Sequence, residues 1–159
     1  MQFQIQALPA QEFDAFFGLS DGALAEHGIM RVVADKSPGF PCRVSLRDAS
    51  VGETLLLLNY EHQKAATPYR ASHAIFVREN ALQARLAEGE VPLLFRHRLM
   101  SIRAFSESGL MVDADVAEGD ELEKPISGML ANPEVGYLQL HYAKPGCYAA
   151  RVDRTVAKP

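Results

Sequence analysis

Apolar and polar residues alternate along most of this chain, a pattern that predicts a protein built mainly of β-strands. In residues 3–7, three apolar side chains alternate with glutamines, which is the two-residue period of a half-buried strand. Residues 54–60 are instead mostly apolar at consecutive positions, which favours a central strand covered on both faces. The remaining predicted strands span residues 29–35, 42–47, 73–78, 98–105, 110–116, 137–142 and 147–152.

Helical segments are few and short. The predicted helices span residues 9–17, 20–27, 80–89 and 119–133, the last interrupted by Pro125. Most neighbouring strands are joined as hairpins, and the regular strand–helix–strand alternation of a parallel sheet is missing. We therefore predict an α+β protein: a single domain over residues 1–159, around a largely antiparallel sheet of eight or nine strands with three or four short helices.

Composition and charge narrow the classes of partner. A length of 159 residues and an apolar content of 48% suffice for a hydrophobic core without disulfides or metals. The net charge of −4 argues against nucleic acid or an anionic membrane as partner. No apolar run approaches the about 20 residues of a membrane span, and residues 1–13 carry no secretory signal pattern. We expect a cytoplasmic protein in which Cys42 and Cys147 are free thiols rather than a disulfide.

The densest group of polar residues surrounds the connection between two predicted strands, within residues 59–76. Glu61 and His62 end one strand, and Tyr69, Arg70 and His73 precede or begin the next. A histidine beside a carboxylate suits acid–base chemistry, and an arginine suits bidentate binding of a carboxylate or phosphate. The structural alternative is that Glu61 and Arg70 form an ion pair that fixes the connection, while the histidines bond the backbone.

Two smaller groups are further candidates. If the turn of the predicted C-terminal hairpin is short, the end of one strand at His141 lies opposite the end of the other at Cys147 and Tyr148. Arg43 shares a predicted strand face with Arg47, and it is free to bind an anion if Arg47 pairs with Asp48. The structural alternatives are a hairpin with aromatic cross-strand pairs and a solvated, charge-balanced strand face.

Basic and acidic residues follow one another in the two strands that flank Gly109. If these strands form a hairpin, Arg98 and Arg103 face Asp113 and Asp115. Such cross-strand ion pairs have a structural role and are worth about 1 kcal/mol or less each when exposed. We prefer this interpretation to a phosphate-binding patch.

Metal and cofactor motifs are missing from the sequence. His62, His73, His141, Cys42 and Cys147 are of types that zinc accepts, but their spacing matches no HxH, HExxH or CxxC signature. A metal site would have to be assembled from distant strands. No glycine-rich phosphate loop is present, and nothing places a thiol beside an imidazole. We therefore expect no cofactor and no metal.

Five blocks, in order along the chain, resemble a known protein family. They are PCRVSLRDA, LLLLNYEHQ, PYRASHAIFVRE, the strand containing RAF, and GCYAARV. From about Phe3 to Arg154 the chain is similar to a bacterial family known only as a domain of unknown function, number twelve hundred and three. The resemblance implies a small bacterial protein of one domain. It implies no reaction, cofactor or catalytic residue.

Polar side chains at strand ends favour a protein that binds a small polar or anionic ligand in a pocket, with or without acid–base turnover. The predicted catalytic residues are Glu61, His62 and His73, and the predicted ligand-binding residues are Arg43, Tyr69, Arg70 and His141. This assignment requires residues 59–76 and the C-terminal hairpin to meet at one cavity. Two alternatives stay open: a non-enzymatic module that forms a homo-oligomer through a sheet edge, and a metal-dependent protein.

Overall fold

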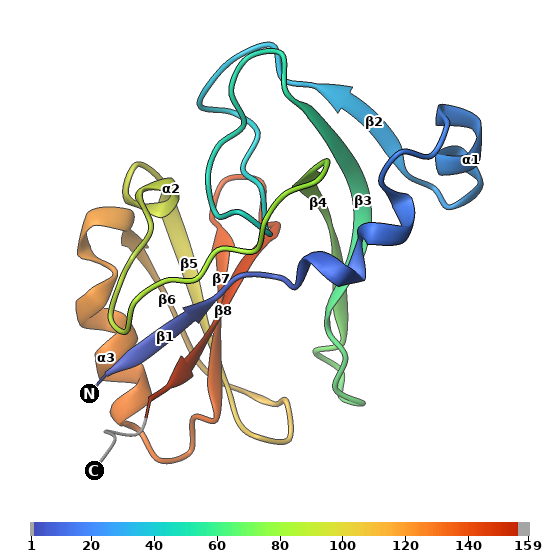
Figure 1. The fold of residues 1–159 in the computed structure, drawn as a ribbon. Helices are drawn as coiled ribbons and strands as arrows, with labels where there is room; N and C mark the ends of the chain where they lie inside the picture. Colours follow the sequence, from blue (N-terminus) through green and yellow to red (C-terminus); the bar gives the residue numbers. More distant parts are fainter. Residues whose placement is uncertain (1, 156–159) are drawn as a thin grey trace.

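The computed structural model describes residues 2–155 and arranges their strands in two antiparallel sheets (Figure 1). One sheet has five strands in the order β1-β8-β7-β5-β6, and the other has three in the order β2-β3-β4. The strands are β1 (Phe3–Gln6), β2 (Met30–Val33), β3 (Thr54–Gln63), β4 (Ala71–Arg78), β5 (Leu99–Phe105), β6 (Met111–Glu118), β7 (Tyr137–Tyr142) and β8 (Tyr148–Arg154). The α-helices are α1 (Asp21–Glu26), α2 (Leu93–Arg96) and α3 (Glu123–Ala131), and the 3-10 turns are η1 (Ala10–Glu12), η2 (Asp14–Phe16) and η3 (Gly119–Glu121).

The predicted α+β class is confirmed, and the strand pairing is antiparallel throughout both sheets. The hairpins β3–β4, β5–β6 and β7–β8 join neighbouring strands, as the sequence pattern indicates. The strands are divided between two sheets, whereas the sequence pattern suggests one. This division matters for function because it creates an interface between two sheets, and buried side chains of both sheets meet there.

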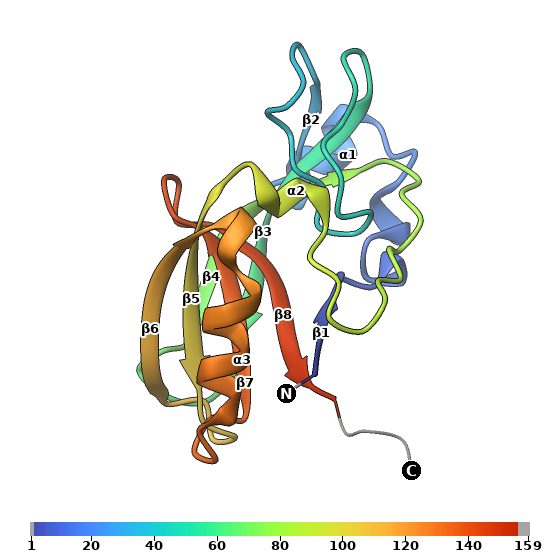
Figure 2. The same ribbon diagram turned by 90° about the vertical axis from the view of Figure 1, so that its left-hand side faces the viewer.

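The two faces of the five-stranded sheet have different covers. Helix α3 lies on one face, where Ile126 and Leu130 join Ile102 and Leu140 in the largest hydrophobic cluster (Figure 2). The three-stranded sheet lies toward the opposite face (Figure 1). Because both faces are covered, every residue of the central strand β7 is buried.

Strand β3 is covered on both faces, as its consecutive apolar residues predict. Leu56 belongs to a cluster with Phe13 and Leu24 from the N-terminal segment. Leu55, on the other face, packs with Ala34 and Ala49 from the loop between β2 and β3. Both leucines are fully buried, which explains why this strand lacks apolar–polar alternation.

Residues 42–47 do not form the predicted strand. They form a turn in which the N–H of Cys42 donates to the carbonyl of Arg47 (3.0 Å) and the N–H of Leu46 donates to the carbonyl of Cys42 (3.1 Å). The φ angle of 48° at Leu46 is left-handed, which a continuous strand excludes. The N–H of Arg43 donates to the carbonyl of Phe76 in β4 (3.1 Å). The turn is therefore attached to the three-stranded sheet, and Arg43 does not lie on a solvated strand face.

The helix prediction for residues 80–89 is also wrong. The N–H of Ala84 donates to the carbonyl of Val44 (2.8 Å), and the carbonyl of Leu86 accepts from Nε2 of Gln4 (2.9 Å). Backbone groups that bond distant partners in this way are not available for helical bonds, so the segment is irregular. Residues 9–17 form η1 and η2 instead of one α-helix, because Phe13 between them has a φ of −117°.

The other two helical predictions are confirmed. Helix α1 begins after Ser20, whose Oγ accepts from the N–H of Ala23 (3.2 Å), the bond expected of a capping serine. Residues 119–133 are helical in two pieces, η3 and α3. The interruption expected at Pro125 is wrong: the two pieces meet at Leu122, and Pro125 lies in the first turn of α3, where a missing N–H costs no helical bond.

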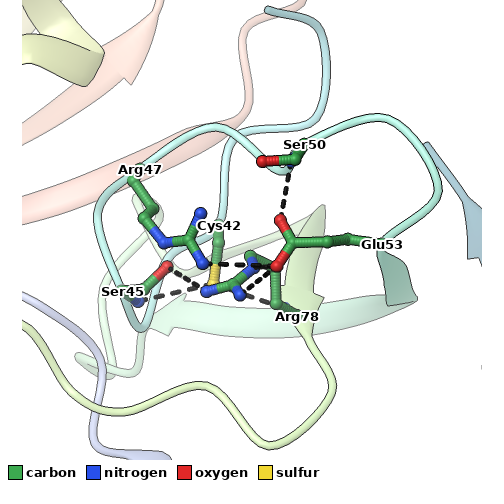
Figure 3. A network of polar contacts seen from close by, with 6 residues as sticks. All are labelled: Cys42, Ser45, Arg47, Ser50, Glu53 and Arg78. Carbon is green, nitrogen blue, oxygen red and sulfur yellow. Dashed lines mark hydrogen bonds and ion pairs between the residues drawn. The ribbon is translucent and has the colours of Figure 1, made fainter. Parts of the chain in front are cut away.

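Glu53 fixes the loop between β2 and β3 through an ion-pair network (Figure 3). Its Oε1 accepts from Arg78 on β4 and, at 3.2 Å, from Nη2 of Arg47. Its Oε2 accepts from the N–H of Ser50 (2.6 Å). These bonds lower the pKa of Glu53 from 4.5 to about 2, first through Arg78 and then through Ser50. The network holds the loop that carries Arg43 against β4.

Within residues 2–155, no helix has the length and apolar character that crossing a membrane requires.

Candidate functional site

Three histidines from both sheets meet between the layers. His62 is the penultimate residue of β3, His73 lies on β4, and His141 lies on β7. Nδ1 of His73 lies 2.7 Å from Nε2 of His62, and one ring nitrogen of each histidine lies within 4.8 Å of the others. Segments that are far apart in sequence therefore place three imidazoles together, although none of them lines the cavity that contains Arg43.

A β-bulge at the end of β3 directs His62 toward β7. The register between β3 and β4 shifts between Glu61 and Gln63, so His62 is the inserted residue. As a result, His62 and its neighbour Gln63 both contact β7. Oε1 of Gln63 accepts from the hydroxyl of Tyr137 (2.9 Å), and Nδ1 of His62 bonds Gln139. In a regular strand these two neighbours would point to opposite faces.

Gln139 fixes the proton on His62. Its Nε2 donates to the backbone carbonyl of His62 (3.0 Å), which leaves Oε1 to accept from Nδ1–H of the same histidine at 2.7 Å. The proton of the neutral His62 ring is thus on Nδ1, and Nε2 keeps its lone pair. In this arrangement Nδ1–H of His73 donates to that Nε2.

His141 has the same proton arrangement for a different reason. Its Nδ1 lies 3.0 Å from the carbonyl oxygen of Gly146, a partner that only an N–H can satisfy. Its Nε2 lies 3.3 Å from Oε1 of Gln139, a longer contact, and a neutral ring has one proton to donate. The shorter bond assigns the proton to Nδ1, so Nε2 of His141 also keeps its lone pair.

Burial keeps all three imidazoles neutral at neutral pH. His141 is fully buried, and burial, followed by the charge of Arg103, lowers its pKa to about 3. Burial lowers the pKa of His62 to about 4, against the opposing hydrogen bond to Gln139. The pKa of His73 is also lowered, by burial and then by the charges of Arg103 and Arg43.

Aromatic and basic residues surround the three histidines. The ring of Tyr148, at the start of β8, stacks on His62 with 5.0 Å between centroids and 14° between planes. Arg103 on β5 lies opposite Gln139 of β7, and burial lowers its pKa. Among the described residues, Arg103 has no hydrogen-bond or ion-pair partner. Its charge therefore acts on the imidazoles without a neighbouring carboxylate to neutralise it.

The predicted cross-strand ion pairs of β5 and β6 are wrong. In the observed register Arg103 lies opposite Ala114, and Asp113 lies opposite Ala104. Arg98 precedes β5 and pairs with Asp48 instead. Asp48 is thereby unavailable to Arg47, which pairs with Glu53. The expected pair of Arg47 with Asp48 is therefore wrong as well.

A cavity of about 390 Å³ is lined by Ala74 and Tyr142, the sequence neighbours of His73 and His141, and by Cys147. Its basic and polar lining comes from Arg43, His97, Arg98, Lys144, Tyr142 and Cys147, and its apolar lining from Pro41, Ala74, Phe76, Leu99 and Pro145, with Gly39 completing the wall. These residues come from the 34–53 loop, β4, the α2–β5 connection with the first residue of β5, the last residue of β7, and the turn of the C-terminal hairpin. No acidic residue of the described chain lines this cavity.

Arg43 is the buried cation of the cavity, with 1% of its surface exposed. Its Nε donates to the carbonyl of Tyr148 (2.8 Å), Nη1 to the carbonyl of Pro41 (2.6 Å), and Nη2 to Sγ of Cys147 (3.0 Å). The guanidinium also lies over the ring of Tyr142, 4.9 Å from its centroid. No described carboxylate pairs with Arg43, and two of its five N–H groups remain for a further acceptor.

Three of the predicted site residues lie elsewhere. Glu61 and Arg70 form an ion pair at the exposed end of the β3–β4 hairpin, the arrangement that the structural alternative describes. Tyr69 is 41% exposed and contacts the edge of Phe105. None of the three lines the cavity or contacts a histidine of the cluster. The two cysteines are free, as expected: Cys42 is buried in the 34–53 loop, whereas Cys147 lines the cavity.

Gln139, Arg103 and Tyr142 are not among the site residues predicted from the sequence. Gln139 had a detectable signal, because it shares with His141 the polar face of a strand in the middle of an apolar region. The hydroxyl of Tyr142 is buried without a hydrogen-bond partner among the described residues, and only coordinates reveal this. Arg103 was assigned to an ion pair that the register does not allow.

The fold, the histidine cluster and the cavity beside Arg43 define an α+β protein with two antiparallel sheets and polar residues between them. The model of the family described as "Protein of unknown function (DUF1203)" matches residues 39–154. The chain belongs to this family, which confirms the resemblance seen in the sequence. The comparison with curated proteins gave no match, and neither did the comparison with solved structures.

Proposed function

We propose that this protein binds a small organic anion in the cavity beside Arg43. The observation that carries the proposal is the burial of the Arg43 guanidinium without a carboxylate partner in the described chain. Burying a cation is unfavourable unless an opposite charge or a full set of hydrogen bonds compensates it. Carbonyl, sulfur and aromatic contacts satisfy Arg43 only in part, and an anion would supply the remaining acceptors.

The charges around the cavity support an anionic ligand. Lys144 is exposed at its rim and has no ion-pair partner among the described residues. Arg98 is neutralised by Asp48 through two bonds, Nη1 to Oδ2 at 3.0 Å and Nη2 to Oδ1 at 2.6 Å. With no acidic lining residue, Arg43 and Lys144 leave the cavity with a net positive charge, which attracts anions.

The apolar wall indicates what kind of anion fits. Phe76, Leu99 and Tyr142 present ring and aliphatic surface to the cavity. A volume of about 390 Å³ is at the lower end of the range of small-molecule sites, which is about 300–1,000 Å³. A carboxylate attached to a ring or a short aliphatic chain would bury its apolar part against this wall and place its charge at Arg43.

The proposal concerns binding rather than turnover. Glu61, the carboxylate that would act with a histidine in acid–base chemistry, is paired with Arg70 and contacts neither the three histidines nor the cavity.

The expectation of a homo-oligomer also stays a prediction, and light scattering of the purified protein would test it.

Benzoate is a suitable first probe because it combines one carboxylate with one ring. We expect benzoate to raise the melting temperature of the protein and to perturb NMR signals of residues 41–43 and 142–147, whereas benzyl alcohol, which lacks the charge, has a smaller effect. The variant Lys144→Glu should weaken benzoate binding, and Lys124→Glu, on helix α3, is the matched control.

Two results would contradict the proposal. One is the absence of an effect from benzoate and from a panel of other small carboxylates and inorganic phosphate. The other is binding that Lys144→Glu and Lys124→Glu weaken equally, because such binding reflects the overall charge of the protein instead of this cavity.

A further inference from the structure

We propose that His62, His73 and His141 form a binding site for a divalent first-row transition metal such as zinc. This inference is separate from the proposed anion cavity, because none of the three histidines lines that cavity. It rests on the positions of the ring nitrogens, on the hydrogen bonds that orient two of the rings, and on the chemical type of the ligands.

The spacing of the ring nitrogens is close to what a metal requires. Zinc–nitrogen bonds of 2.0–2.1 Å in a tetrahedral site place two ligand nitrogens about 3.3–3.4 Å apart. The nitrogens of His62 and His73 are 2.7 Å apart, and those of all three histidines lie within 4.8 Å of one another. To hold a metal, the nitrogens of His62 and His73 would have to separate by about 0.6 Å and any longer separation to His141 would have to close to about 3.4 Å.

Hydrogen bonds to the outer nitrogens prepare two of the rings for a metal. A metal-binding histidine usually donates its second ring N–H to a carbonyl or carboxylate oxygen, which fixes the ring and its tautomer. Nδ1–H of His62 donates to Oε1 of Gln139, and Nδ1–H of His141 donates to the carbonyl of Gly146. Nε2 of both rings is thus the nitrogen with a lone pair to offer, and Nε2 of His62 already faces His73.

His73 completes the site through its Nδ1. This nitrogen donates a hydrogen bond to Nε2 of His62. On metal binding, the proton of His73 moves to its Nε2 through solvent, so that the lone pair of Nδ1 becomes available. His73 and His62 are each partly exposed, which gives a metal ion and water access to the cluster, whereas His141 closes it from within.

The ligand set selects the class of metal. Imidazole nitrogens suit zinc, copper, nickel and iron, whereas magnesium and calcium need oxygen ligands. Three protein ligands leave one coordination position for water or an anion, as in catalytic zinc sites. The unpaired Arg103 favours an anion at that position.

Cobalt tests this proposal directly, since tetrahedral cobalt coordinated by histidine absorbs visible light. Tag-free protein, treated with a chelator and dialysed, is titrated with Co²⁺ and then with Zn²⁺ as a competitor. We expect a visible absorption band that saturates at one cobalt ion per chain and disappears on addition of zinc. Saturating zinc should also raise the melting temperature by about 5 °C or more.

Two variants separate this site from non-specific binding by surface histidines. His73→Phe keeps an aromatic ring stacked on His62 but removes the ligand nitrogen, and should lower cobalt affinity at least about tenfold. His27→Ala, which removes the exposed histidine at the C-terminal end of helix α1, should leave the affinity unchanged. A circular dichroism spectrum and a melting curve without metal verify that each variant folds.

The proposal is overturned if the wild-type protein shows no saturable cobalt band, or if His73→Phe binds cobalt as the wild type does. It is equally overturned if His27→Ala weakens binding as much as His73→Phe. Because these titrations contain no carboxylate probe, their result is independent of the experiment with benzoate.

Discussion

Arg43 donates its Nε–H to the backbone carbonyl of Tyr148 at 2.8 Å, across 105 positions of sequence. The ring of the same tyrosine stacks on His62. One residue therefore supports both candidate sites: its backbone orients the buried guanidinium of the cavity, and its side chain forms a wall of the histidine cluster.

Replacing Arg43 tests how much this bond contributes. We expect Arg43→Met to lower the free energy of unfolding by about 2–4 kcal/mol, because the carbonyls of Tyr148 and Pro41 lose a charged donor in a buried place. Chemical denaturation measures this loss. Benzoate should no longer stabilise the variant, even at temperatures where it is fully folded. A variant as stable as the wild type would show that packing, and not these bonds, holds Arg43.

Glu53 predicts a specific dependence of stability on pH. Its pKa is lowered from 4.5 to about 2 in the folded state, so its stabilising effect is fully present above pH 4.5 and is lost as the pH falls toward 2. The side chain is partly exposed, and solvent screening reduces the contribution to about 1–2 kcal/mol. Glu53→Gln should be less stable by this amount at pH 7 and should lose less stability between pH 4.5 and 2. Parallel pH profiles for the two proteins would refute this role.

For Tyr142 we expect a substitution that does not lower the free energy of unfolding, in contrast to those at Arg43 and Glu53. Its hydroxyl is buried without a partner among the described residues, and burying an unpaired hydroxyl is unfavourable. Tyr142→Phe should therefore leave stability within about 0.5 kcal/mol or raise it by up to about 1 kcal/mol. A loss of more than 1 kcal/mol in thermal or chemical unfolding would mean that the hydroxyl bonds an ordered water.

Gln139 is predicted to position the histidines without binding the metal itself. Gln139→Leu should weaken cobalt binding about tenfold, because Nδ1–H of His62 loses its acceptor. Gln139→Glu supplies a carboxylate acceptor at the same place and should restore most of the affinity, although it loses the bond to the His62 carbonyl. If both variants bind cobalt equally weakly, the role of Gln139 is packing alone.

The sequence predicted local structure where the local pattern and the tertiary structure agree. Ser20 caps α1, and the run of leucines in β3 identified a strand covered on both faces. The predictions of a strand at residues 42–47 and of a helix at residues 80–89 are wrong. In both segments backbone groups bond distant partners, such as the N–H of Ala84 to the carbonyl of Val44. In residues 42–47 the side chains alternate in type but not in burial, because the turn buries Arg43 along with Cys42 and Val44.

The candidate sites depend on features that one sequence does not reveal. His62, His73 and His141 were candidates from their residue type, but their meeting depends on the packing of two sheets and on the bulge at His62. The sequence predicts Arg43 as an anion-binding residue on a strand, whereas in the structure it lies in a turn. Glu61 and Arg70 were candidates because of their position in a long connection, and they pair with one another.

The bonds of Gln63 to Tyr137 and of His62 to Gln139 have a consequence for the packing of the two layers. Apolar sheets tolerate sliding by a residue pair, since one leucine replaces another with little loss. These two polar bonds have no equivalent in a shifted arrangement, so they define a single alignment of the three-stranded sheet on its neighbour. A metal ion held by His62, His73 and His141 would act there as a cross-link between the sheets.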